Sequence, residues 1–306
     1  MDSTVSLAEY LEHLTSVECV DFCARRSNIA VDAVRARLIQ YAGEVQVGVS
    51  MLSPVTLRNR SVLEVGAGLG LLGIWLKRRG VSVTLLEPGA GGFDHNRRLI
   101  EAVREFLHAS DTPVLPIAAA ELDPARHGLF DVIYSVNVLE HIPDVETALL
   151  AMVGVLTHDG VMRHTCPNYA VPYEPHYGIP LVPFKPSFTA AIAPSLADEE
   201  LWRSLSFITY GRVVRFCRAH RLRYRFDGGL LAEAFGRLDR DAAFGMRHAG
   251  PIRVAHRFLT ATRLRSLLAL VPPQWATPMA FSCWREGERN DAAGCSHSDG
   301  DVEPRR

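Results

Sequence analysis

Residues 61–80 read SVLEVGAGLGLLGIWLKRRG and decide the fold. Residues 62–65 form a short, mostly apolar run that is typical of a buried strand, and three closely spaced glycines follow at once. From residue 69 to residue 79 apolar side chains recur at roughly helical spacing, and Gly80 ends the pattern. The stretch therefore predicts a strand, a glycine turn and a helix, in that order.

The glycine turn, with Gly66, Gly68 and Gly70, can do more than reverse the chain. Without Cβ atoms the backbone lets a ligand approach closely, and the N–H groups that open the helix can donate hydrogen bonds to an acidic group. A dinucleotide-binding turn needs glycine at position 71, where this chain has Leu71. Glu64 lies two residues before the first glycine, and a carboxylate there suits an ammonium or sulfonium ligand better than a pyrophosphate.

A second carboxylate strengthens the case for a nucleoside ligand. Residues 81–86 predict a second strand that ends on Glu87, 23 residues after Glu64. In doubly wound folds a carboxylate at this point can bind the ribose hydroxyls of a nucleoside, although a lone strand-end acid can equally be exposed. Glu64 with the glycine turn resembles the first motif of the class I S-adenosylmethionine (SAM) dependent methyltransferases, and in that setting ribose binding is the better interpretation of Glu87.

The string FDVIYSVNVLEHIPD, residues 130–144, is the most specific signal in the chain. It resembles the fourth motif of small-molecule methyltransferases, the group that includes the ubiquinone-biosynthesis-type O-methyltransferases, and it lies at the expected distance from the first motif. The resemblance implies that His141, just past the strand edge that faces the methyl group, is the first candidate for a general base. The pair Glu140-His141 can also be read as residues that merely flank a helix.

The third motif departs from the family pattern. The position that aligns with the acid commonly offered to adenine is Ala119, so adenine recognition is expected from backbone groups near Ala120 or from Glu121. The resemblance thus implies one set of cofactor-binding residues: Glu64, Gly66, Ala67, Gly68, Gly70, Glu87, Ala120, Glu121 and Asn137.

Residues 163–186 follow the predicted core and are rich in proline and aromatic side chains. Prolines exclude a regular helix and make a stiff loop, which in methyltransferases lies where the substrate pocket is built. Tyr169, Tyr173, Glu174 and Tyr177 are therefore predicted pocket residues, with a purely structural loop as the alternative. His164 and His176 are second candidates for the base; the histidines and acids here match no metal-ligand spacing, so no metal is expected.

Composition limits the other possibilities. The chain has 306 residues, 48% hydrophobic, and a formal net charge of −1, which gives no argument for a nucleic-acid partner. Six cysteines without C-x-x-C pairing and an N-terminus without signal-peptide features predict a reducing, cytoplasmic setting. No apolar run is long enough for a membrane span, but an arginine-rich amphipathic segment at 253–271 leaves peripheral membrane contact open beside ordinary surface or dimer packing.

The fold class predicted is α/β: a doubly wound, Rossmann-like, mostly parallel sheet with flanking helices. Helices are expected at 5–25 and 29–41, the second with Asn28 as its N-cap, followed by a connector at 43–59. The domain assignment is a helical cap at 1–58, a methyltransferase domain at 59–285 with a substrate loop at 163–200 and a helical insertion at 228–278, and a disordered tail at 286–306.

Together these features predict a SAM-dependent methyltransferase that acts on a small-molecule or lipid-like acceptor, with O-methylation preferred. Two alternatives remain: a nicotinamide-dependent oxidoreductase, opposed by Leu71 and Glu64, and a non-catalytic protein of the SAM-binding fold. Oligomeric state and the acceptor itself are left open by the sequence.

Overall fold

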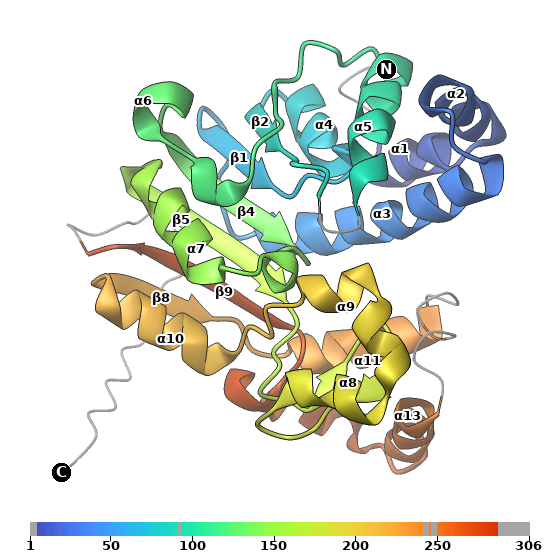
Figure 1. Ribbon diagram of the computed structural model, residues 1–306, viewed down its shortest axis with the longest axis vertical. Coiled ribbons are helices and arrows are strands. Elements are labelled where there is room, and N and C mark those ends of the chain that lie inside the picture. Colours follow the sequence, from blue (N-terminus) through green and yellow to red (C-terminus); the bar gives the residue numbers. More distant parts are fainter. Residues whose placement is uncertain (1–4, 91–92, 241–244, 246–249, 287–306) are drawn as a thin grey trace.

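A computed structural model describes residues 5–90, 93–240, 245 and 250–286, and in these residues a seven-stranded sheet runs through the molecule (Figure 1). Its strand order is β3-β2-β1-β4-β5-β9-β8; the first five strands in this order pair in parallel, and β9 is antiparallel to both of its neighbours. The strands are β1 Ser61–Val65, β2 Ser82–Leu86, β3 Val114–Leu115, β4 Phe130–Val136, β5 Leu156–Cys166, β8 Leu222–Phe226 and β9 Met279–Arg285. The predicted doubly wound, mostly parallel sheet is confirmed.

Helices cover both faces of this sheet. The α-helices are α1 Leu7–Leu14, α2 Val17–Ser27, α3 Val31–Leu52, α4 Leu71–Arg78, α5 Asp94–Phe106, α6 Pro124–His127, α7 Val145–Gly154, α8 Thr189–Ile192, α9 Glu200–Ser204, α10 Tyr210–Ala219, α11 Leu230–Arg240 and α13 Pro251–Ala261. Short 3₁₀ helices are Ala119–Glu121, Leu139–His141, Pro186–Phe188, Pro194–Asp198, Leu264–Leu270 and Pro273–Trp275. A separate two-stranded hairpin consists of β6 Tyr173–Glu174 and β7 Ile179–Pro180. None of the helices in the described part of the chain is both long and apolar enough to cross a bilayer.

The core has two halves, one on each face of the sheet, because side chains alternate along each strand. On β1, Val62 packs with residues of α1 to α5, whereas Leu63 and Val65 pack on the opposite face with residues of α7 and α10. All three are almost fully buried. Burial on both faces explains why the strand reads as a nearly continuous apolar run.

The N-terminal prediction was wrong in two details. The helix expected at 5–25 is two helices, because the Ser16 side chain accepts a hydrogen bond from the Cys19 N–H and caps a new helix. Asn28 does not cap the next helix; it ends α2 in the left-handed conformation, at φ 56°, and Ala30 precedes α3 without a side-chain cap. Asparagine tolerates the left-handed region and so serves at either end of a helix.

The connector expected at 43–59 was also largely wrong, since α3 continues to Leu52. Gly48 lets this part of α3 pack closely on α4, because a Cβ there would lie 2.3 Å from Leu72 Cδ2. The predicted substrate loop begins later than expected, because β5 continues to Cys166. The expected tail at 286–306 lies outside the described residues apart from Glu286.

Arg163 joins distant parts of this fold. It is 3% exposed and donates to the Met51 carbonyl at the end of α3, to the Ser282 hydroxyl on β9 at 2.7 Å, and to the Asp227 carboxylate at 2.5 Å. A buried charge with all these partners is stable only while its countercharge remains.

We therefore expect Asp227→Ala to lower the free energy of unfolding by about 3 kcal/mol, because it leaves the Arg163 guanidinium buried without a countercharge. Chemical denaturation measures this. The matched control is Glu146→Ala, which removes a 2.6 Å pair with Arg212 whose side chains are 45% and 26% exposed; it should cost less than about 1 kcal/mol. Equal losses in the two variants would contradict the role given to Arg163.

Candidate functional site

The glycine turn after β1 has a backbone that other residues adopt only with strain. Gly66, Gly68 and Gly70 have φ values of 66°, 57° and 72°, in the left-handed region. A Cβ on Gly66 would lie 2.4 Å from the Val138 side chain, and one on Gly68 would lie 2.1 Å from the Tyr41 ring. The turn is therefore fixed by close approach of neighbouring segments as well as by its own torsion angles.

Glu87 lies at the end of β2 and contacts this turn directly. One carboxylate oxygen accepts a hydrogen bond from the Gly68 N–H at 2.7 Å, and the other accepts from the Gly89 N–H at 2.8 Å. The side chain is 5% exposed, and burial raises its pKa while the two backbone N–H groups oppose that shift. The second predicted acid and the glycine turn thus lie together at the carboxyl edge of the sheet. The strand order reverses here, because β2 lies on one side of β1 and β4 on the other.

Glu64 is buried beneath the turn. Its carboxylate accepts a hydrogen bond from the Gly73 N–H of α4 at 3.0 Å, and burial raises its pKa to about 8. In this structure the carboxyl group of Glu64 therefore holds helix α4 against strand β1. An interaction between Glu64 and the positive charge of a ligand above the turn remains a prediction.

The remaining predicted cofactor residues flank the same edge. Ala120 and Glu121 lie in the 3₁₀ helix after β3, where the Glu121 carboxylate accepts from the Ala118 N–H at 2.7 Å. Asn137 follows β4 in the left-handed conformation, and its N–H donates to the Thr165 carbonyl at 2.8 Å. Ala67, between two of the glycines, donates its N–H to the Leu86 carbonyl at 2.9 Å. Their contacts with adenine or ribose stay predictions.

Tyr41 of α3 is a site residue that the sequence did not reveal. Its ring covers Gly68, and its hydroxyl is 3.0 Å from the Asn96 amide nitrogen of α5. No motif marks it, because it lies in the helical segment before the first strand. The N-terminal helices thus extend over the glycine turn.

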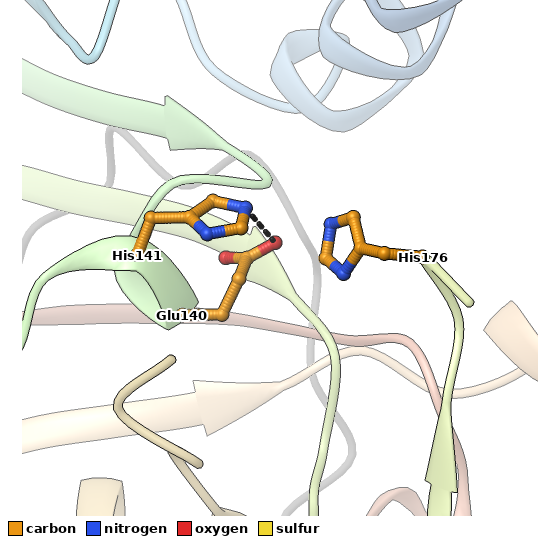
Figure 2. Close-up of side chains that lie close together, drawn as sticks. All are labelled: Glu140, His141 and His176. Carbon is orange, nitrogen blue, oxygen red and sulfur yellow. Dashed lines mark ion pairs between the residues drawn. The ribbon is translucent and has the colours of Figure 1, made fainter. Parts of the chain in front are cut away.

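Glu140, His141 and His176 form a cluster next to the carboxyl end of β4, as Figure 2 shows. Their nearest ligand atoms all lie within 4.8 Å of one another, and the two imidazole centroids are 4.9 Å apart. Burial, with a smaller effect from His176, lowers the pKa of His141 to about 3, so its imidazole is neutral at physiological pH. Burial raises the pKa of Glu140 to about 8. The structure therefore joins two of the three predicted base candidates with a glutamate that the sequence left as a flanking residue.

Glu174 organises the predicted pocket loop around this cluster. The carboxylate is fully buried and accepts from the Tyr169 hydroxyl at 3.1 Å and the Tyr177 N–H at 2.7 Å. It also lies 2.6 Å from Nδ1 of His176. Tyr173 precedes it on β6 and is half-buried. Three of the four predicted pocket residues and His176 thus share one hydrogen-bonded unit.

His164 is apart from the cluster. It lies on β5, is fully buried against Phe281, and has Nδ1 at 2.8 Å from the Ser135 hydroxyl. Burial lowers the pKa of this imidazole to about 3. Its placement inside the sheet differs from the loop position expected for it, because β5 extends beyond the predicted start of the loop.

The comparisons with known proteins agree with this geometry. Residues 36–227 match the family model described as a methyltransferase domain. The uncharacterized protein Rv1509 of Mycobacterium tuberculosis is 32% identical over 221 residues, which cover 69% of this chain and 74% of that protein. The ubiquinone biosynthesis O-methyltransferase of Alkalilimnicola ehrlichii is 33% identical over 99 residues, which cover 31% of this chain and 36% of that one. Among solved structures, the geranyl diphosphate C-methyltransferase from Streptomyces coelicolor A3(2), crystallised with S-adenosyl-L-homocysteine, shares 12% identity with a TM-score of 0.51, covering 83% of this chain and 81% of that one.

The two buried glutamates predict how stability depends on pH. Because the folded-state pKa values of Glu64 and Glu140 are raised to about 8 from 4.5, the folded state binds more protons than the unfolded state between these pH values. Stability should therefore fall as pH rises from about 5 to 8, by at most about 1.4 kcal/mol per pH unit for each group.

Glu64→Gln keeps an acceptor for the Gly73 N–H but does not titrate. The free energy of unfolding of this variant should therefore fall less steeply with pH, by the contribution of one titrating group. Urea denaturation across the pH series measures it, with exposed Glu18→Gln as the control. A slope in Glu64→Gln equal to that of the parent would show that Glu64 does not hold a proton in this range.

Proposed function

The chain belongs to the family of class I SAM-dependent methyltransferases, and from that premise we propose that it transfers a methyl group to an oxygen of a small-molecule or lipid-like acceptor. SAM is the cofactor. The observation that carries the rest is the approach of Glu87 to the glycine turn, with the Glu140, His141 and His176 cluster beside the same end of the sheet. We propose the cytoplasm as the place of action, in keeping with the free buried cysteines of the described residues.

Methyl transfer from a sulfonium is an in-line displacement in which the positive charge disappears as the new bond forms. The donor is already activated, so the protein mainly aligns sulfur, methyl and nucleophile in a dry site. The glycine turn supplies close backbone approach, and Glu87 supplies an acceptor for the ribose hydroxyls. We propose that the buried Glu64 adds negative charge beneath the turn once the sulfonium is bound.

An acceptor hydroxyl must lose its proton during the transfer. An imidazole is the natural group to accept this proton near neutral pH. His176 lies against His141 and is held by Glu174. We assign removal of the acceptor's proton to these two histidines. His164, which is buried in the sheet, is assigned a structural role.

The acceptor is proposed to enter over the β6–β7 hairpin and its neighbours. Helices α8, α9, α11 and α13 form a lobe beside the carboxyl edge of the sheet (Figure 1). This lobe and the 3₁₀ helices Pro186–Phe188 and Leu264–Leu270 expose large apolar side chains, among them Phe188, Ile192, Phe258 and Leu270, at 58–76% exposure. Such exposure, with arginines on α13, favours an apolar or lipid-like acceptor over a strongly polar one.

The alternatives differ in what they bind and do. A nicotinamide-dependent oxidoreductase is excluded by membership of the methyltransferase family. A non-catalytic SAM-binding protein would bind SAM and transfer no methyl group to any acceptor. Supplying labelled SAM to extracts with and without the protein, and identifying labelled products, separates this from the proposed enzyme.

Glu87→Ala should weaken SAM binding about 10- to 150-fold, because a hydrogen bond to a charged group is worth about 1.5–3 kcal/mol. Isothermal titration with SAM measures the change. Exposed Glu101→Ala on α5 is the matched control and should bind SAM as the parent does. Unaltered SAM affinity in Glu87→Ala would mean that the ribose is bound elsewhere.

His141→Ala should reduce the rate of methyl transfer about 100-fold or more while SAM affinity changes little, because proton removal contributes about 10²–10⁴ to such reactions. Turnover is followed by labelled methyl incorporation, and SAM affinity by titration. The control is exposed His158→Ala on the far part of β5. Full turnover in His141→Ala would remove this residue from the chemistry.

A further inference from the structure

The cluster of Glu140, His141 and His176 combines residues from two segments that are far apart in the sequence. Glu140 and His141 end the 3₁₀ helix after β4, whereas His176 lies in the tip of the β6–β7 hairpin. Nε2 of His141 is 4.0 Å from Oε1 of Glu140, and a ring nitrogen of His176 faces the same carboxylate in Figure 2. Three atoms that can each offer a lone pair thus converge on one point.

Hydrogen bonds outside the cluster fix which nitrogen each imidazole presents. The Ser204 hydroxyl donates its proton to the Leu201 carbonyl at 2.7 Å, so at 3.2 Å it can only accept from Nδ1–H of His141. Likewise, Nδ1 of His176 carries the proton that it donates to the Glu174 carboxylate at 2.6 Å. With these bonds a neutral ring has its lone pair on Nε2 in either residue, and Nε2 of His141 lies 4.0 Å from Oε1 of Glu140.

Glu140 supplies an independent observation. Its side chain is fully buried, and among the described residues neither carboxylate oxygen has a hydrogen-bond partner. Buried carboxylates are normally satisfied by donors or cations, since leaving one unpaired costs free energy. No donor among the described residues reaches these oxygens, and the nearest ligand atoms are those of His141 and His176, so a cation bound between the three side chains would satisfy the carboxylate.

We propose that Glu140, His141 and His176 bind a divalent transition-metal ion of the zinc type, with at least one coordination position left for another ligand. Two imidazole nitrogens and one carboxylate form a donor set typical of catalytic zinc and of related transition-metal sites. Magnesium and calcium prefer oxygen ligands, so the two nitrogens disfavour them. The carboxylate of Glu174 and the hydroxyl of Ser204 then play the usual part of outer partners that orient ligating histidines.

The distances suit this assignment after a small contraction. Zinc binds nitrogen and oxygen at about 2.0–2.2 Å, so tetrahedral ligand atoms lie about 3.4 Å apart. The three donor atoms here are within 4.8 Å of one another, so an ion would draw them together by roughly 1 Å. His176 is on a hairpin tip, where such a movement disturbs no strand of the main sheet. The sequence expectation of no metal rested on spacing alone, and this site is built by two segments whose separation follows no motif.

The ion's task in the reaction rests on the proposed function, whereas its binding does not. A metal ion next to an acceptor hydroxyl lowers the pKa of that hydroxyl and holds the resulting oxygen anion. In the metal-bound protein His141 would be a ligand and not a base, and the acceptor's proton would pass to solvent water. His141→Ala lowers turnover in either case, but only the metal-bound form loses activity on treatment with a chelator.

The test is direct metal binding. Protein freed of metal with EDTA and dialysed is titrated with Zn²⁺ by calorimetry and with Co²⁺ by visible absorption. One equivalent should bind, and Co²⁺ should give the absorption of a low-coordinate nitrogen and oxygen site. Glu174→Gln should weaken Zn²⁺ binding about 10- to 100-fold and His176→Ala by more than that, with SAM affinity measured in each variant to show that it is folded.

Two controls guard against binding elsewhere. His158→Ala removes an exposed histidine, and His297→Ala removes one from the sequence CSHSD at 295–299; both should keep the parent's Zn²⁺ affinity. Absence of binding in the parent, or affinity unchanged in both His176→Ala and Glu140→Gln, would overturn the metal site. If the protein binds SAM and transfers methyl groups but binds no metal, this inference is rejected and the proposed function stands. If it binds metal but not SAM, the metal site stands and the proposed function is rejected.

Discussion

The hydrogen bond from the Gly68 N–H to Glu87 joins the ends of two neighbouring strands, and the candidate cofactor site depends on it. A carboxyl group at the end of β2 accepts a hydrogen bond from the glycine turn, whose positive φ angles only glycine adopts at low cost. The same carboxylate also accepts from Gly89, so both loops at this edge are tied to one side chain. A ligand that binds here meets a surface that is already formed.

The two sides of the site are built differently. On the cofactor side, short loops follow directly from parallel strands. Glu87 accepts hydrogen bonds from the backbone of two of these loops, and Glu64 accepts one from Gly73 in α4. On the acceptor side, a long proline-rich segment is organised around the buried Glu174. This division is common in α/β enzymes, where a rigid edge binds the shared cofactor and variable segments determine the acceptor.

The cofactor side of the site could be predicted from the sequence more fully than the acceptor side. The order of strands, the glycine turn and Glu87 could be predicted because strand periodicity, glycine spacing and motif distance are local signals. The extension of α3 to Leu52 was not predicted, because its last turns are held by packing against a distant segment, as Gly48 packs against Leu72 of α4. Tyr41 over Gly68, and His176 beside Glu140, are contacts between distant segments, and no spacing in the sequence encodes them.

His164 shows the opposite failure. As a histidine near the end of the fifth strand it is as attractive in the sequence as His176, yet in the structure its side chain is fully buried against Phe281. Whether a histidine near a predicted strand end faces the site or the core depends on where the strand stops, and strand ends are the least certain part of a sequence prediction.

The central claim is that the glycine turn and Glu87 together bind the nucleoside part of SAM. A crystal structure of the protein with S-adenosyl-L-homocysteine tests it most directly. The account predicts that the ribose hydroxyls lie at hydrogen-bond distance from the Glu87 carboxylate and that the nucleoside lies over Gly66 and Gly68. A nucleoside bound away from both would contradict the account.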